Sequence, residues 1–180
     1  IKYVPQILNH KPSAIELMDE EVIDVAKSNP STASRSGFID SKSKGILIVE
    51  FFGDNEEDIH SKHEFLKSNL SEINSVCSVT FYFENSSSFK DIWDVRKKGV
   101  GLLLSVKSEA KPIPFIEDLA IPVEHLHEYI SKLLKFCDNL GVKIVLYAHA
   151  SVGVLHVRPI LNMHLQEDID RMQKISESAL

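Results

Sequence analysis

The feature that most constrains the fold is a pair of strand-like runs joined by a short turn near the end of the chain. Residues 142–147 are hydrophobic apart from Lys143, residues 155–160 form a second extended run, and the segment between them contains Gly153. Two such runs around a short glycine-containing segment are typical of an antiparallel β-hairpin. A turn centred on Val152 and Gly153 places His149 directly opposite His156.

This hairpin gathers four polar side chains on one patch. Strand alternation puts Tyr147 and Arg158 on the same face as His149 and His156. Two imidazoles, a phenol and a guanidinium can bind a metal ion or an anionic substrate. The alternative is a half-buried, hydrogen-bonded histidine pair without chemistry, and the spacing alone favours this alternative.

Composition limits the class of protein. A chain of 180 residues forms one domain or a piece of a larger protein, and 43% hydrophobic with 26% charged residues is ordinary for a globular domain. The formal net charge of −6 argues against nucleic-acid binding but allows a local basic pocket for a carboxylate. The sequence lacks an apolar run of roughly 18 residues, so no membrane span is predicted.

The two cysteines and the missing motifs narrow the chemistry. Cys77 and Cys137 each lie in an apolar element, so we expect reduced core thiols in a cytoplasmic protein, and two thiols are too few to hold a four-iron cluster. A signal peptide is also not predicted. The sequence has no glycine-rich phosphate-binding turn of the Rossmann or P-loop type and no Gly-x-Ser-x-Gly elbow.

Hydrophobic periodicity predicts an α+β fold with a mostly antiparallel sheet covered on one face by helices. The predicted strands are residues 14–18, 45–53, 76–84, 112–121, 142–147 and 155–160. The predicted helices are residues 3–10, 21–27, 56–73, 89–106, 123–140 and 166–180, and residues 31–44 form a long loop. Gly99 and Gly101 are expected to interrupt their helix, and to mark a close approach of the backbone to a neighbour.

The segment from Tyr147 to Pro159 resembles the histidine motif of the FAD-linked oxidase C-terminal domain, whose common form is Gly-His-x-Gly-Asp-Gly-Asn-x-His. Both histidines and Gly153 are kept, whereas Ala148, Ser151-Val152 and Val154 depart from that form. The variant is followed by Val157-Arg158-Pro159 and is similar to the branch of the family that is fused to an iron–sulfur module.

Three further segments carry the same resemblance in the same order. Residues 14–19 are similar to the family's A-x-E-L-M-D strand, residues 93–96 match its W-x-x-R, and residues 115–122 match its E-D-x-A-V-P strand exit. The similarity covers nearly the whole chain. Several ordered motifs are more specific than any one of them.

The resemblance implies a ferredoxin-like α+β cap domain on the substrate side of a flavoprotein. Such proteins oxidise D-lactate, glycolate or D-2-hydroxyglutarate by hydride transfer to FAD, which is bound mainly by a separate domain. We therefore expect residues 1–180 to be a single domain and a fragment of a larger flavoenzyme, with its FAD-binding domain upstream and a C-terminal part also outside the chain. The expected partners are a small 2-hydroxy acid, that FAD-binding domain and an iron–sulfur module. We expect the fragment alone to be inactive, and the sequence does not identify which of its residues would contact the flavin.

The resemblance also implies roles for individual side chains. Arg96 is expected to grip the substrate carboxylate, although a solvated surface charge is the better interpretation without the resemblance. Arg158 is either a second anion contact or a charge at a strand edge. Tyr147 is a candidate substrate contact, but a half-buried core aromatic is the more common role of such a tyrosine. His149 and His156 are expected to bind a divalent metal such as zinc or manganese, or one of them takes the hydroxyl proton directly.

Glu117 and Asp118 compete for one place. Adjacent strand residues face opposite sides, so only one of these carboxylates is expected to point at the site. We favour Glu117, which would orient an imidazole or complete a metal shell.

A different class of function is a stand-alone module that binds a small carboxylate or a metal through the same histidine face. The apolar residues 100–104 are a candidate docking surface for a flavin domain, and ordinary core is the favoured interpretation. The remaining histidines are expected at the surface: His10, His60, His63, His125, His127 and His164.

Overall fold

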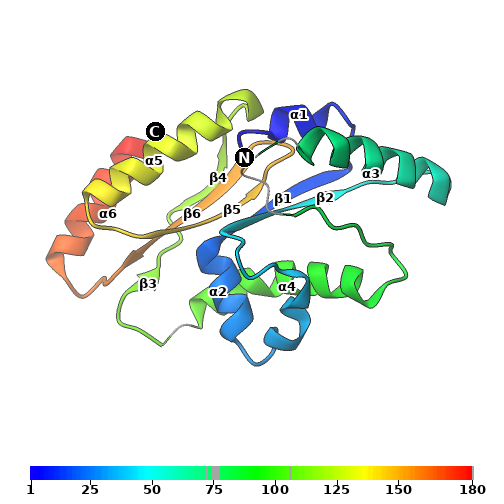
Figure 1. Cartoon of the computed structure of the whole chain (residues 1–180). Coiled ribbons are helices and arrows are strands. Elements are labelled where there is room, and N and C mark those ends of the chain that lie inside the picture. Colours follow the sequence, from blue (N-terminus) through cyan, green and yellow to red (C-terminus); the bar gives the residue numbers. More distant parts are fainter. Residues whose placement is uncertain (72, 74–77, 106, 180) are drawn as a thin grey trace.

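The computed structural model describes residues 1–71, 73, 78–105 and 107–179. A six-stranded sheet forms its middle layer, with strand order β2-β1-β5-β6-β3 and with β4 also paired to β6 (Figure 1). The strand pairings of the described residues are antiparallel. The strands are β1 (Ala14–Asp19), β2 (Gly45–Glu50), β3 (Lys111–Pro112), β4 (Ile116–Ala120), β5 (Ile144–His149) and β6 (Val154–Leu161).

Helices begin where the sequence supplies caps. The Asp19 carboxylate accepts from the Val22 amide at the start of α2, Asn55 caps α3, and Ser86 caps α4. The helices are α1 (Val4–Leu8), α2 (Glu20–Ser28), α3 (Glu56–Ser71), α4 (Ser87–Leu104), α5 (Leu126–Asn139) and α6 (Gln166–Ala179), with 3₁₀ turns at Ala33–Phe38 and Val123–His125. Of the described helices, none has both the length and the apolar character needed to cross a bilayer.

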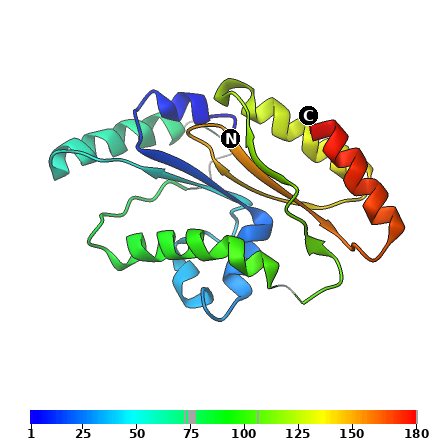
Figure 2. The ribbon, with the colours of Figure 1, turned by 180° about the vertical axis from the view of Figure 1, so that it is seen from behind.

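The predicted α+β fold with a mostly antiparallel sheet is confirmed, but helices cover both faces of the sheet and not one. The larger core lies between the sheet and α1, α3, α5 and α6, and a second core lies under α2 and α4 (Figures 1 and 2). The reason is visible in β1, where Ile15 and Leu17 enter the first core while Met18 enters the second. A strand buried on both faces needs cover on both sides.

Two local predictions are wrong. Residues 78–83 are not a strand, while residues 76 and 77, with Cys77, lie outside the described part of the chain. Phe81 packs instead on α3, where its ring stacks on His63 at 4.5 Å, so the expected surface position of His63 is also wrong. The alternation of aromatic residues reflects this contact with a helix and not a place in the sheet.

Gly99 and Gly101 do not interrupt α4, which continues to Leu104. A methyl group on Gly99 would lie 3.0 Å from the Val22 side chain. The expected close approach is therefore the packing of α4 against α2, and it fixes α4 beneath the sheet.

Candidate functional site

The hairpin between β5 and β6 has a register two residues away from the predicted one. Tyr147 pairs with His156, and His149 pairs with Val154. The turn is shifted because Gly153 adopts a φ of +70° and accepts a hydrogen bond from the Ile121 amide, a contact that sequence spacing does not reveal. An even shift leaves every side chain on its own face.

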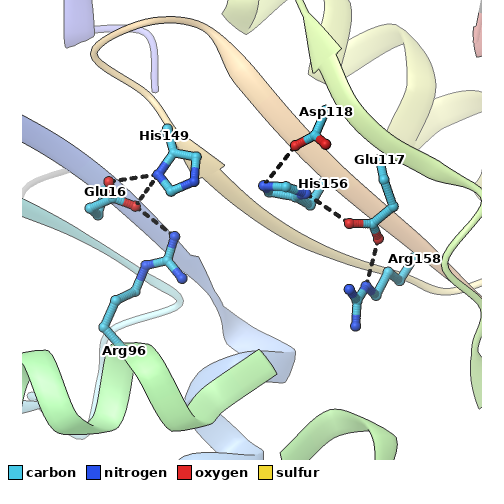
Figure 3. A network of polar contacts seen from close by, with 7 residues as sticks. All are labelled: Glu16, Arg96, Glu117, Asp118, His149, His156 and Arg158. Atoms are coloured by element: carbon cyan, nitrogen blue, oxygen red, sulfur yellow. Dashed lines mark hydrogen bonds and ion pairs between the residues drawn. The ribbon is translucent and has the colours of Figure 1, made fainter. Parts of the chain in front are cut away.

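The predicted grouping on one face is therefore confirmed. Across β1 and β5, Glu16 pairs with His149 and Met18 pairs with Tyr147. Across β5 and β6, Tyr147 pairs with His156. Arg158, two residues after His156 on β6, pairs with Val145 of β5. This is the sheet face that α2 and α4 cover, and Arg96 reaches it from α4 (Figure 3).

Glu16, Arg96 and His149 form one polar unit. Arg96 donates from Nη2 to Glu16 Oε2 at 2.6 Å, and His149 Nδ1 lies 2.8 Å from Glu16 Oε1 and 3.0 Å from Oε2. The side chains of Glu16 and Arg96 are buried, whereas that of His149 is 49% exposed. The interpretation of Arg96 as a surface charge is therefore wrong, since a buried arginine requires a partner.

Glu117, His156 and Arg158 form a second unit of the same composition. His156 Nδ1 lies 2.8 Å from Glu117 Oε2, and Arg158 donates from Nε to Oε1 at 2.7 Å (Figure 3). Burial alone would raise the pKa of Glu117, but the hydrogen bonds from Arg158 and His156 outweigh it and hold that pKa below its usual value. Glu117 is therefore placed to orient the His156 imidazole, which is one of the two roles predicted for it.

Asp118 also reaches the site, which corrects the expectation that only one of the adjacent carboxylates faces it. Asp118 has a φ of +55°, and the pairing of β4 with β6 shifts register between Ile116 and Leu119. A bulge breaks the alternation of side chains along a strand. The Asp118 carboxylate consequently lies 3.8 Å from His156 Nε2, across the ring from Glu117.

Tyr147 lies between the two units. Its ring stacks on His156 at 4.5 Å, and the guanidinium carbons of Arg96 and Arg158 lie 5.4 and 5.3 Å from its centroid. Burial raises the pKa of the phenol, so Tyr147 stays neutral at ordinary pH. This packing supports the interpretation as a buried aromatic that spaces the arginines.

Both arginines keep a buried donor without a partner among the described residues. The atoms are Arg96 Nε and Arg158 Nη1, each inaccessible to solvent. A buried N–H without an acceptor costs about 1–3 kcal/mol. Both donors lie on the sheet face of the two histidines, and an anionic oxygen reaches them only when the side chains that cover them move.

Sequence reasoning missed Glu16. The A-x-E-L-M-D resemblance includes Glu16 but implies no role for it. The available signal was its position: a charged residue inside a strand, with the apolar neighbours Ile15 and Leu17 on either side. Such a residue in a strand covered on both faces needs a buried partner.

Comparison with known proteins assigns the family. The sequence pattern of "FAD linked oxidases, C-terminal domain" matches residues 1–180. The chain belongs to this family. This FAD-linked oxidase domain thus carries both predicted features of the resemblance, the histidine hairpin and the W-x-x-R arginine, on one face of its sheet.

Curated relatives of this FAD-linked oxidase domain share one name. D-2-hydroxyglutarate dehydrogenase of Escherichia coli is 31% identical over 194 aligned positions that cover the whole chain, and that of Haemophilus influenzae is 31% identical over 191. The Pseudomonas putida protein of the same name is 32% identical over 162 positions, covering 87% of the chain. The chain spans 16–18% of the length of these relatives.

The domain's own residues do not complete a metal shell. Within the described part of the chain, no group of three or more His, Cys, Asp or Glu side chains is placed to hold a metal ion. Glu117 was the predicted third ligand, but its two oxygens are taken by His156 and Arg158. A zinc or manganese ion held by His149 and His156 would therefore need a further ligand from outside the described residues, because catalytic zinc has three protein ligands.

The family implies FAD, and one edge of the polar cluster is open to solvent. His149 is half exposed and Asp118 is 83% exposed, so this edge of the polar cluster opens to solvent. Away from this edge, α2 and α4 cover the sheet face that carries the cluster.

Proposed function

We propose that this domain forms the substrate side of an FAD-dependent enzyme that oxidises a D-2-hydroxy acid with two carboxylates, of the D-2-hydroxyglutarate type. The observation that carries the proposal is the pair of buried, unpartnered donors on Arg96 and Arg158. The name shared by the curated relatives supports the same substrate class.

Two arginines distinguish a dicarboxylate from a monocarboxylate. Each guanidinium already uses one nitrogen on a glutamate, through Arg96 Nη2 and Arg158 Nε, and keeps a second nitrogen free. A ligand with two carboxylates satisfies both free donors. D-Lactate and glycolate, with one carboxylate each, would leave one buried donor unpaired.

The two imidazoles lie between the carboxylate contacts and are placed to accept the hydroxyl proton. Their rings are 5.6 Å apart, and Glu16 and Glu117 hold one nitrogen of each. FAD, when bound, supplies the acceptor for the hydride that leaves the α-carbon. The chain's contribution is orientation: fixed carboxylates set the hydroxyl against an imidazole.

We further propose that the domain works beside an FAD-binding domain of the same protein, and that an iron–sulfur module carries the electrons onward. The small share of the relatives' length that the chain spans supports additional domains. The alternative of a stand-alone binding module has no observation in its favour beyond the site itself. The cytoplasmic location stays a prediction.

The test is anaerobic reduction of the flavin in the full-length protein that carries this chain. D-2-Hydroxyglutarate is expected to bleach the flavin absorbance, and D-lactate or glycolate to do so with at least about 100-fold lower kcat/KM, because each leaves a buried donor unpaired. Equal rates with D-lactate would overturn the dicarboxylate proposal. Absence of reduction by every D-2-hydroxy acid would overturn the oxidation proposal itself.

A further inference from the structure

Glu16 connects the two parts of the site that have different tasks. Its Oε2 atom accepts from Arg96 Nη2 at 2.6 Å and lies 3.0 Å from His149 Nδ1, while Oε1 lies 2.8 Å from the same nitrogen. The three residues come from β1, α4 and the end of β5. One carboxylate therefore holds a predicted anion contact and a predicted proton acceptor together.

The unit is built to be rigid. Glu16 lies on β1 between β2 and β5, and its side chain is 12% exposed. The neighbour of Arg96 in sequence, Val95, is fully buried in the core under α2 and α4. Removing one member of a buried ion pair leaves an uncompensated charge, which is strongly unfavourable.

The contact also fixes the form of His149. A carboxylate only accepts hydrogen bonds, so the neutral imidazole must carry its proton on Nδ1 and keep its lone pair on Nε2.

We infer that Glu16 is a positioning residue that locks the Arg96 guanidinium and the His149 imidazole into one unit, with His149 Nε2 presented to the substrate hydroxyl. The catalytic role of this unit rests on the proposed function, in which Arg96 binds a carboxylate and an imidazole receives a proton. The lock itself is a property of the chain without substrate.

The second unit differs in one respect that makes Glu16 distinctive. Glu117 uses one oxygen for His156 and the other for Arg158. Glu16 accepts from Arg96 through Oε2, and His149 Nδ1 lies within hydrogen-bond distance of both Oε1 and Oε2. A change in the position or charge of Oε2 therefore disturbs both partners at once.

The first experiment reads the tautomer of His149 by ¹⁵N NMR of the imidazoles in the chain. We expect the Nδ1–H form in the wild type, and Glu16→Gln to lower the ratio of Nδ1–H to Nε2–H about tenfold, because a charge-assisted hydrogen bond is lost. His156, held by Glu117, is the internal reference and should keep its ratio. Glu50→Gln is the matched control, because Glu50 lies on the neighbouring strand and bonds Ser13.

Glu16→Asp guards against a variant that does not fold. Aspartate keeps the charge that Arg96 requires, but its carboxylate is one methylene shorter and cannot serve both partners. The His149 ratio should change in this variant as well. An unchanged ratio in either folded variant would overturn the inference.

The second experiment measures turnover in the full-length holoprotein. Glu16→Gln is expected to lower kcat and to raise KM for the hydroxy acid, each about 10- to 100-fold, because the anion contact and the proton acceptor both lose their support. Unchanged kinetics in Glu16→Gln with an active wild type would overturn the inference. A wild type inactive on all D-2-hydroxy acids would instead overturn the proposed function, and the NMR result would then decide the role of Glu16 alone.

Discussion

Asp19 shows at the scale of one residue how the sheet is tied to a helix. Its carboxylate accepts from the Val22 amide at the start of α2 and from the Leu146 amide of β5, at 2.9 and 2.5 Å. Burial raises its pKa from the usual 3.8 to about 6, against the two hydrogen bonds, and the neighbouring charges of Glu21 and Glu20 add to the increase. The carboxyl is therefore more basic in the folded state than in the unfolded state.

This pKa predicts a pH dependence of stability. Between about pH 4 and 6 the folded state holds more protons than the unfolded state, so the free energy of unfolding should fall as pH rises, by about 2–3 kcal/mol from this group. Urea unfolding measures this free energy across the pH range. It should fall less in Asp19→Asn than in the wild type, and the exposed Asp24→Asn variant, as the control, should behave like the wild type. Equal slopes in Asp19→Asn and wild type would contradict this account.

Arg158 is the residue whose loss should change substrate choice. Arg158→Gln keeps a donor for Glu117 but removes the charge and the free Nη1. We expect kcat/KM for D-2-hydroxyglutarate to fall about 100-fold and that for a monocarboxylate to change much less, because only the dicarboxylate needs both arginines. Steady-state kinetics of the holoprotein measure this, with the half-exposed Arg35→Gln as control. A parallel loss for both substrates would show that Arg158 is structural.

Individual site residues were predictable where their types stand out in the sequence. His149, His156, Arg96 and Arg158 lie together as expected, although their roles stay predictions. Glu16 was not predictable because its partners lie 80 and 133 residues away and meet it only through strand pairing.

At the scale of elements, the β5–β6 turn depends on one glycine. Gly153 has a φ of +70°, and a methyl group there would overlap the Ile121 carbonyl oxygen. Gly153→Ala should lower the free energy of unfolding by at least about 2 kcal/mol, since left-handed backbone alone costs an ordinary residue about 1–2 kcal/mol.

Gly101→Ala is the matched control for this turn. Gly101 lies in α4, and no atom of the described residues comes within 4 Å of an added methyl group, so its replacement should raise the free energy of unfolding by about 0.5–1 kcal/mol. Chemical denaturation of both variants checks the pair. A neutral Gly153→Ala would show that the turn geometry is not required.

The same elements show what local patterns leave open. The hairpin was predictable from its two runs, but its register was not, because the Ile121 contact shifts the turn. The bulge in β4 was equally hidden, since nothing in the Glu117-Asp118 dipeptide indicates a positive φ at Asp118. Both features depend on neighbouring strands that are distant in sequence or irregularly paired.

At the scale of the whole molecule, two cores support one site. The core against α5 and α6 fixes β5 and β6, which carry the histidines, while the core under α2 and α4 fixes the helix that carries Arg96 (Figure 1). The α+β class followed from periodicity. The second covered face did not, because hydrophobic runs as short as β1 do not reveal which side is buried.

The central claim is that the two arginines, each paired with a glutamate and beside a histidine, bind the two carboxylates of one D-2-hydroxy acid. The most direct measurement is a crystal structure of the full-length protein with D-2-hydroxyglutarate bound. The account predicts one carboxylate on Arg96 Nε, the other on Arg158 Nη1, and the hydroxyl group within hydrogen-bond distance of His149 or His156. A ligand bound away from this sheet face, or held by one arginine with the other donor still unpaired, would contradict it.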